Sequence, residues 1–205
     1  MHQSVLDVFP MFTTRLEGRV PHMYLDILGL VTIGQGCLID PVHLAVPLPF
    51  KTKKGDAPAT RQQILEEFTR IKSRQNLKTL HYNYAGKLCQ LYLPGEEIDR
   101  LTQARMALFE GQLLKALPDF ADWPADAQFA TMSMSWAMGA GFVKKWPSWR
   151  TCALERDWNG CAKNCKIREA GNPGLVPRNQ ANARLFKAAA QTQEPDRLTA
   201  AAVGL

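Results

Sequence analysis

The stretch MYLDILGLVTIGQG, residues 23–36, decides how the fold begins. Strand-forming residues run from Tyr24 to Ile33 and are interrupted by Leu28 and Gly29, which predicts a β-hairpin with glycine in its turn. Gly34 and Gly36 close this unit, because glycine adopts backbone conformations that other residues avoid.

Helical patterns surround the hairpin on both sides. We expect residues 5–18 to form a short helix that is broken at Pro10 and ends at Gly18. A second helix should start at Thr60, which has capping-box spacing to Gln63. Prolines make residues 37–58 irregular, and residues 77–93 fit either short strands or a loop. Further helices are expected over residues 96–116, 125–138, 148–164 and 178–190.

The helix over 125–138 is apolar nearly all round, which is typical of a helix at the centre of a fold. Together these patterns predict an α+β, mainly α fold in a single domain of residues 1–205. A small N-terminal lobe, about residues 1–95, would carry the hairpin and an inserted region. A helical C-terminal lobe would cover about residues 96–205.

Charge and cysteine content restrict the partners only weakly. The net charge of +6 suits a polyanionic partner, and equally suits a domain that is charged for solubility. We interpret the five cysteines as buried free thiols, with a disulfide somewhere within the segment from Cys152 to Cys165 as the alternative. The scattered histidines predict no metal site, and no stretch reaches the roughly 20 apolar residues that span a bilayer.

Two carboxylates near the hairpin are candidates for acid–base chemistry. Hydrolysis of a glycosidic bond needs one protonated acid and one ionised carboxylate. Glu17 stands at a helix end beside an apolar face, where desolvation favours the protonated form. Asp26 lies on the hairpin, and the Thr32 hydroxyl on the returning strand could hold a water. Taken alone, these residues favour the simpler interpretation of a solvated surface glutamate and a turn-stabilising aspartate.

The string Glu17-Gly18, Tyr24-Leu25-Asp26 and Gly29 to Gly36 closely resembles the N-terminal signature of the phage-type lysozymes, glycoside hydrolase family 24. The resemblance implies a lysozyme-like fold and an endo-acting muramidase. Such an enzyme inverts the anomeric centre as it cuts the bond between N-acetylmuramic acid and N-acetylglucosamine. It also implies that Glu17 is the general acid and that Asp26 and Thr32 place the attacking water. No cofactor and no metal are required.

The C-terminal half is similar to the family more loosely. Residues 126–141 look like its central buried helix, and residues 175–186 look like its closing segment, in which a basic residue lies near the catalytic glutamate. We therefore expect Arg178, with Tyr24 and Gln35, to bind substrate. Cys37 and Trp136-Ala137-Met138-Gly139 depart from the family pattern, as does the long region 37–95. These departures suggest a divergent antibacterial toxin or secretion-effector branch.

The resemblance also implies partners and a place of action. Peptidoglycan strands would be the substrate of a monomer that binds no nucleic acid and does not span the membrane. An immunity protein or secretion machinery would be further partners. Residues 1–10 lack the features of a secretory signal, so action in the periplasm or outside the cell would need another delivery route.

Two other functions remain open on the sequence. One is a non-catalytic peptidoglycan-binding domain that keeps the lysozyme fold. The other is a basic, helical nucleic-acid-binding protein. The aromatic and basic cluster from Lys144 to Arg150 could stack sugars or nucleic-acid bases, although such a cluster is more often a packing corner at a helix start.

Overall fold

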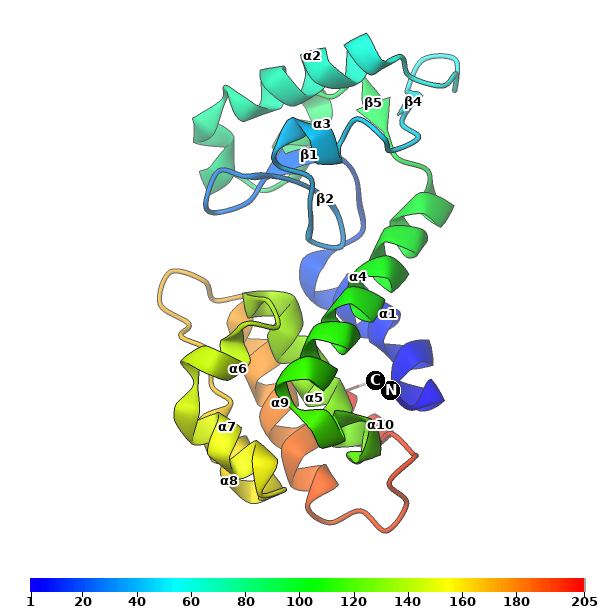
Figure 1. Cartoon of the computed structure of the whole chain (residues 1–205). Helices are drawn as coiled ribbons and strands as arrows, with labels where there is room; N and C mark the ends of the chain where they lie inside the picture. The colour runs from blue at the N-terminus through cyan, green and yellow to red at the C-terminus, as the bar shows by residue number, and fades with distance from the viewer. Residues whose placement is uncertain (205) are drawn as a thin grey trace. The chain divides into compact units, whose positions relative to one another are not determined.

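The protein is mainly helical and carries two small antiparallel sheets, which confirms an α+β, mainly α fold. A computed structural model describes residues 1–204 (Figure 1). The chain divides into two compact units. The sheet unit is Glu17–Arg105, and the helical unit comprises Met1–Leu16 together with the chain from Met106 onward.

The sheet unit is built on a three-stranded antiparallel sheet in the order β1-β2-β3. Its strands are β1 (Val20–Leu25), β2 (Val31–Gly34) and β3 (Cys37–Leu38). Tyr24 pairs with Thr32, so the hairpin predicted around Gly29 is confirmed.

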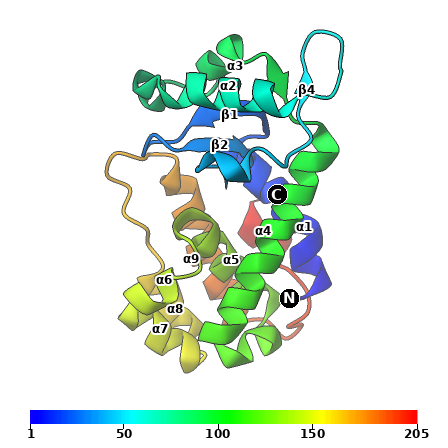
Figure 2. The same ribbon diagram turned by 45° about the horizontal axis from the view of Figure 1, so that its top comes forward.

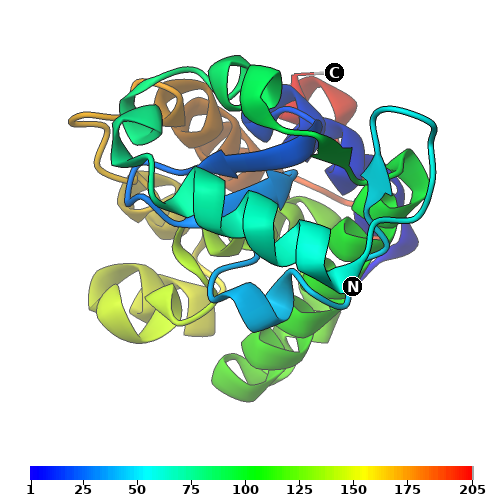
Figure 3. The ribbon, with the colours of Figure 1, turned by 90° about the horizontal axis from the view of Figure 1, so that it is seen from above.

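Helix α2 (Arg61–Lys72) packs against this sheet (Figure 3). It begins at Thr60, as predicted: the Thr60 hydroxyl accepts from the N–H of Gln63, and the Gln63 side chain accepts from the N–H of Thr60. Ile64, Phe68 and Ile71 are buried in the same cluster as the inner face of the sheet. The helix is therefore held by its apolar face as well as by its cap.

The remainder of the sheet unit consists of short elements and one helix that continues into the other unit. These elements are η1 (Val42–Leu44), β4 (Lys51–Thr52), η2 (Gln75–Thr79), α3 (Asn83–Leu88), β5 (Leu91–Tyr92) and α4 (Gly95–Ala116). The segment 77–93, for which strands and a loop were both open, thus also contains a short helix. Strands β4 and β5 pair as a second, two-stranded sheet.

One buried carboxylate connects α2 to β5. The Glu67 side chain is only 2% exposed. Its oxygens accept from the N–H groups of Gln90 at 2.6 Å and Leu91 at 3.1 Å, and from the Arg70 guanidinium at 2.7 Å. A charge is tolerated there because hydrogen bonds replace those it made to water.

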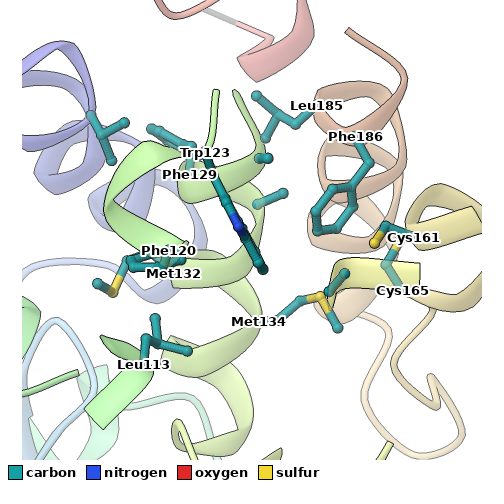
Figure 4. Close-up of a cluster of buried hydrophobic side chains, with 14 of the residues drawn as sticks. Leu113, Phe120, Trp123, Phe129, Met132, Met134, Cys161, Cys165, Leu185 and Phe186 are labelled. Atoms are coloured by element: carbon teal, nitrogen blue, oxygen red, sulfur yellow. The ribbon is translucent and has the colours of Figure 1, made fainter. Parts of the chain in front are cut away.

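The helical unit surrounds α5 (Ala125–Met138), which is buried from Ala125 to Trp136. The central buried helix predicted over residues 125–138 is therefore confirmed. Helix α9 (Leu175–Ala189) lies beside it (Figures 1 and 2). Figure 4 shows the aromatic, aliphatic and sulfur side chains of the surrounding core. The unit also contains α1 (Gln3–Glu17), η3 (Pro118–Asp122), α6 (Phe142–Lys145), α7 (Pro147–Leu154), α8 (Trp158–Asn164) and α10 (Ala200–Val203).

The break predicted at Pro10 is wrong, because α1 runs through it. Proline inside a helix removes one backbone hydrogen bond and costs about 3 kcal/mol. Val5, Phe9 and Phe12 are buried in the helical core, and each such side chain contributes roughly 1.5–3 kcal/mol. Burial of this apolar face offsets the loss at Pro10.

The single helix predicted over residues 148–164 is also wrong, since α7 and α8 are separate. Arg156 has a φ of 56°, which an α-helix does not accommodate. Asp157 then caps α8 by accepting from the N–H of Gly160 at 2.8 Å.

All five cysteines are free thiols, and four of them are buried, as interpreted from the sequence. Cys37 and Cys89 lie in the sheet unit, and Cys161 and Cys165 lie in the helical unit, whereas Cys152 is partly exposed. Burial raises the pKa of Cys89 to about 12 and that of Cys165 to about 11. Both therefore remain protonated and unreactive at neutral pH.

Among the helices of residues 1–204, none combines the length and apolar character needed to cross a membrane. In the same residues, no group of three or more His, Cys, Asp or Glu side chains is arranged to hold a metal ion.

Candidate active site

Glu17 is the last residue of α1 and the first residue of the sheet unit. Gly18 follows it with a φ of 76°, a left-handed conformation that ends the helix without strain. The chain then enters β1 at Val20, so the helix end and the sheet are joined by only two residues. The Glu17 side chain is partly buried.

Asp26 lies directly after β1, in the turn of the hairpin. Its Oδ1 accepts from the N–H groups of Leu28 and Leu30, each at 2.9 Å. Asp26 thus does stabilise the turn, and the turn in return fixes the orientation of the carboxylate. No group within residues 1–204 donates to Oδ2, which leaves that oxygen for water or a ligand.

Tyr24 and Thr32 are directly opposite each other on neighbouring strands, so their side chains share one face of the sheet. Asp26 follows Tyr24 by two positions, and its N–H continues the ladder to the carbonyl of Leu30. The alternation of side chains therefore places Asp26 on that face too. The Thr32 hydroxyl donates to the carbonyl of Leu30 at 3.2 Å, and its oxygen can still accept from a water.

The turn between β2 and β3 brings a third element to Glu17. A Cβ on Gly36 would lie 3.3 Å from Oε2 of Glu17 and 3.8 Å from Nη1 of Arg105. Arg105, on α4, also donates to the carbonyl of Gly36. The glycine therefore lets a carboxylate and a guanidinium approach the same turn.

Electrostatic interactions connect the two carboxylates through Tyr24. Burial raises the pKa of the Tyr24 hydroxyl, and the carboxylates of Glu17 and Asp26 raise it further, whereas the Arg105 guanidinium lowers it. The hydroxyl therefore stays protonated at neutral pH and can donate a hydrogen bond. Burial also raises the pKa of the Cys37 thiol, while the Arg105 guanidinium opposes that shift.

Aromatic side chains border this group of residues. The ring of Tyr82 lies 6.0 Å from that of Tyr24, and the ring of His81 lies 4.0 Å from that of Tyr82. A Cβ on Gly18 would lie 3.1 Å from Oη of Tyr82, so the tyrosine hydroxyl lies next to the residue that follows Glu17. His81 is exposed, and sugar rings commonly stack on such partly exposed aromatic surfaces.

Gln35 and Arg178 lie deeper than the other predicted site residues. Each side chain is 1% exposed. Gln35 is in the same turn as Gly36, whereas Arg178 belongs to the helical unit, where it donates to the carbonyl and the hydroxyl of Ser133 at 3.0 and 3.2 Å. Side chains this buried position their neighbours and offer little surface to a glycan.

The sheet unit thus brings together four of the six predicted site residues, Glu17, Tyr24, Asp26 and Thr32, of which Thr32 is itself buried at 4% exposure. Sequence reasoning missed Arg105. Arg105 is one of several charged residues in the long helix α4. The sequence alone does not indicate which of these side chains lies against the Gly36 turn. Tyr82 and His81 were noticed only as members of a region without recognisable motifs.

The fold and site define a mainly helical α+β protein with two carboxylates and a threonine around a β-hairpin. No protein-family model matches the chain. No curated protein matches it either.

We predict that Gly36→Ala lowers any activity of this site by about 10- to 100-fold, because the new methyl group displaces the Glu17 carboxylate. Gly55→Ala is the matched control: its φ of 90° is also left-handed, but nothing lies within 4 Å of its Cβ. Both variants should lose similar stability in thermal unfolding. Equal activity of the two variants would contradict the proposed role of the Gly36 turn.

Proposed function

We propose that the protein is an endo-acting peptidoglycan hydrolase, a muramidase that cleaves the β-1,4 bond between N-acetylmuramic acid and N-acetylglucosamine. The observation that carries the proposal is that Tyr24 lies close to both carboxylates. Glu17 and Asp26 both raise the pKa of its hydroxyl, and Thr32 is its partner on the neighbouring strand. Paired carboxylates on one surface are what glycoside hydrolysis requires.

In the proposed reaction, Glu17 donates its proton to the leaving glycosidic oxygen. A water held by Oδ2 of Asp26 and the Thr32 hydroxyl attacks the anomeric carbon from the opposite face. Asp26 accepts the proton that the water loses, so the anomeric configuration is inverted. The two N–H donors on Oδ1 keep the Asp26 carboxylate from rotating while this water is oriented.

Two further arguments support this proposal. The string from Glu17 to Gly36 resembles the signature of glycoside hydrolase family 24, in which these three residue types have these roles. A small unit with a hairpin and a separate helical unit also agrees with the lysozyme-like fold that the resemblance implies. The partly exposed Tyr82 and the exposed His81 would extend the contact with the sugar chain.

The proposed substrate also implies a place of action. We propose that the protein works on the wall in the periplasm or outside the cell, as a bacteriolytic enzyme or a delivered toxin. In the second case a dedicated immunity protein would cover the face that carries Glu17 and Asp26.

The experiment is digestion of purified sacculi by the full chain, with the products followed by proton NMR. Reducing muropeptides that first appear as the α-anomer support an inverting muramidase. First products of β-configuration would contradict the water geometry proposed for Asp26 and Thr32. Binding to sacculi without any new reducing ends would favour the non-catalytic peptidoglycan-binding alternative.

A further inference from the structure

A small hollow opens at the start of α7, in the helical unit. Its volume is about 290 Å³, and its lining includes Lys145, Trp146, Ser148, Trp149, Asn164 and Lys166. These side chains come from the end of α6, the first turn of α7 and the C-terminal end of α8 with the residues just after it, three helices grouped together in Figure 2. We refer to it as the α7 hollow.

Trp149, which lines the α7 hollow, carries an unpaired donor. The side chain is 1% exposed and packs against Phe142 and Phe186, with ring centroids 4.9 and 6.1 Å away. Its indole N–H has no acceptor among residues 1–204. A buried donor without an acceptor lowers the stability of the fold, so such groups are rare and often have a ligand or another role.

The first turn of α7 offers further donors at the same place. The first N–H groups of a helix have no partner within it and carry partial positive charge. The N-cap residue Trp146 makes no side-chain hydrogen bond to them, and Pro147 occupies the first position. An uncapped helix start of this kind is suited to an anion.

The charge of the surrounding segment points to the same ligand class. Residues 144–168 contain seven Lys or Arg and two Asp or Glu, so they carry five of the six net positive charges of the chain. Lys145 and Lys166 line the α7 hollow, and of these two only Lys166 has an acidic partner within residues 1–204, the partly buried Glu169 at 3.4 Å. Asn164 and Ser148 add uncharged polar groups to the lining.

We propose that the α7 hollow is a binding site for an oxyanion, a carboxylate or phosphate group of an acidic cell-wall polymer. The oxyanion would accept from the free N–H groups of the α7 start and from the Trp149 indole, and Lys145 and Lys166 would neutralise its charge. The choice of a wall polymer rests on the proposed function, whereas the oxyanion site itself rests on the α7 hollow alone.

The first test uses the full chain labelled with ¹⁵N. Inorganic phosphate and N-acetylalanine are titrated in turn, and the five indole N–H signals are followed, with Trp149→Phe identifying the signal of interest. A saturable shift of the Trp149 signal larger than that of the other four supports the site. No selective shift with either probe overturns it, whatever the protein does to sacculi.

The second test uses Lys145→Ser/Lys166→Ser and its matched control, Lys144→Ser/Lys163→Ser. Both doubles remove two positive charges from the same segment, but Lys144 and Lys163 are exposed and lie outside the lining. Both carry Glu17→Gln in addition, so that sacculi stay intact during a pelleting assay. We expect the hollow variant to bind sacculi at least fivefold more weakly than the control.

The source of the oxyanion is distinguished by treating the sacculi beforehand. Loss of binding after the carboxylates are amidated assigns the ligand to the peptide stems. Loss after hydrofluoric acid treatment assigns it to wall phosphodiesters. Equal pelleting of the two double variants would overturn the proposal. Selective loss of duplex DNA binding in the hollow variant, with sacculus binding unchanged, would replace the wall polymer by nucleic acid.

Discussion

We expect the Glu17→Gln variant to fold as the wild-type chain does and to release muropeptides at least about 100-fold more slowly. Glutamine has nearly the same shape as glutamate, and the Glu17 side chain is only partly buried, so the helix end and the Gly36 turn stay in place. An amide cannot donate a proton to the leaving oxygen, and the barrier to bond cleavage rises. The measurement is the initial rate of reducing-end formation from sacculi, with circular dichroism to check the fold.

Glu96→Gln is the matched control, since Glu96 is an exposed glutamate in the first turn of α4, in the same unit. Its activity should lie within about twofold of wild type, because a single exposed charge that is screened by solvent contributes little. If Glu17→Gln kept wild-type activity, Glu17 could not be the general acid.

The largest loss of stability is expected for Glu67→Ala, at about 2–4 kcal/mol. The substitution removes the acceptor of three donors: the N–H groups of Gln90 and Leu91 and the Nη2 group of Arg70. Arg70 remains partly exposed and can recover some hydration, so we do not expect the full cost of a broken buried ion pair. Urea unfolding monitored by circular dichroism measures the change.

The neighbouring Glu66 provides the control for this experiment. It is exposed, and within residues 1–204 it accepts only from the Gln62 side chain one turn away, at 2.8 Å, so Glu66→Ala should change stability by no more than about 0.5 kcal/mol. Similar losses in the two variants would mean that the connection from Glu67 to β5 contributes little.

Local patterns predicted those parts of the fold that depend on local physics. The hairpin follows from strand formers around Gly29, the start of α2 from the Thr60 cap, and the buried α5 from its apolar surface. The predictions failed where tertiary packing overrides a local rule. Pro10 stays inside α1 because Phe9 and Phe12 are buried beside it, and nothing in the residues themselves reveals the positive φ of Arg156.

The candidate site was predictable for a similar reason and to a similar extent. Asp26 and Thr32 lie within one short string, and the strand register that pairs Tyr24 with Thr32 places both on one face of the sheet. Only two residues separate Glu17 from β1. Arg105 reaches the Gly36 turn from a helix more than 60 residues further along the chain. Contacts of that range depend on how the whole sheet unit packs, and single-sequence patterns do not encode them.

Because the thiols are distributed over both units, their reactivity can be used to measure the local opening of each unit. Each unit hides two cysteines, Cys37 and Cys89 in one and Cys161 and Cys165 in the other, while Cys152 alone is partly open to solvent. An alkylating reagent should therefore modify Cys152 first and each hidden pair only when its own unit opens. Peptide mapping of the order of labelling would follow the two units separately, without any added probe.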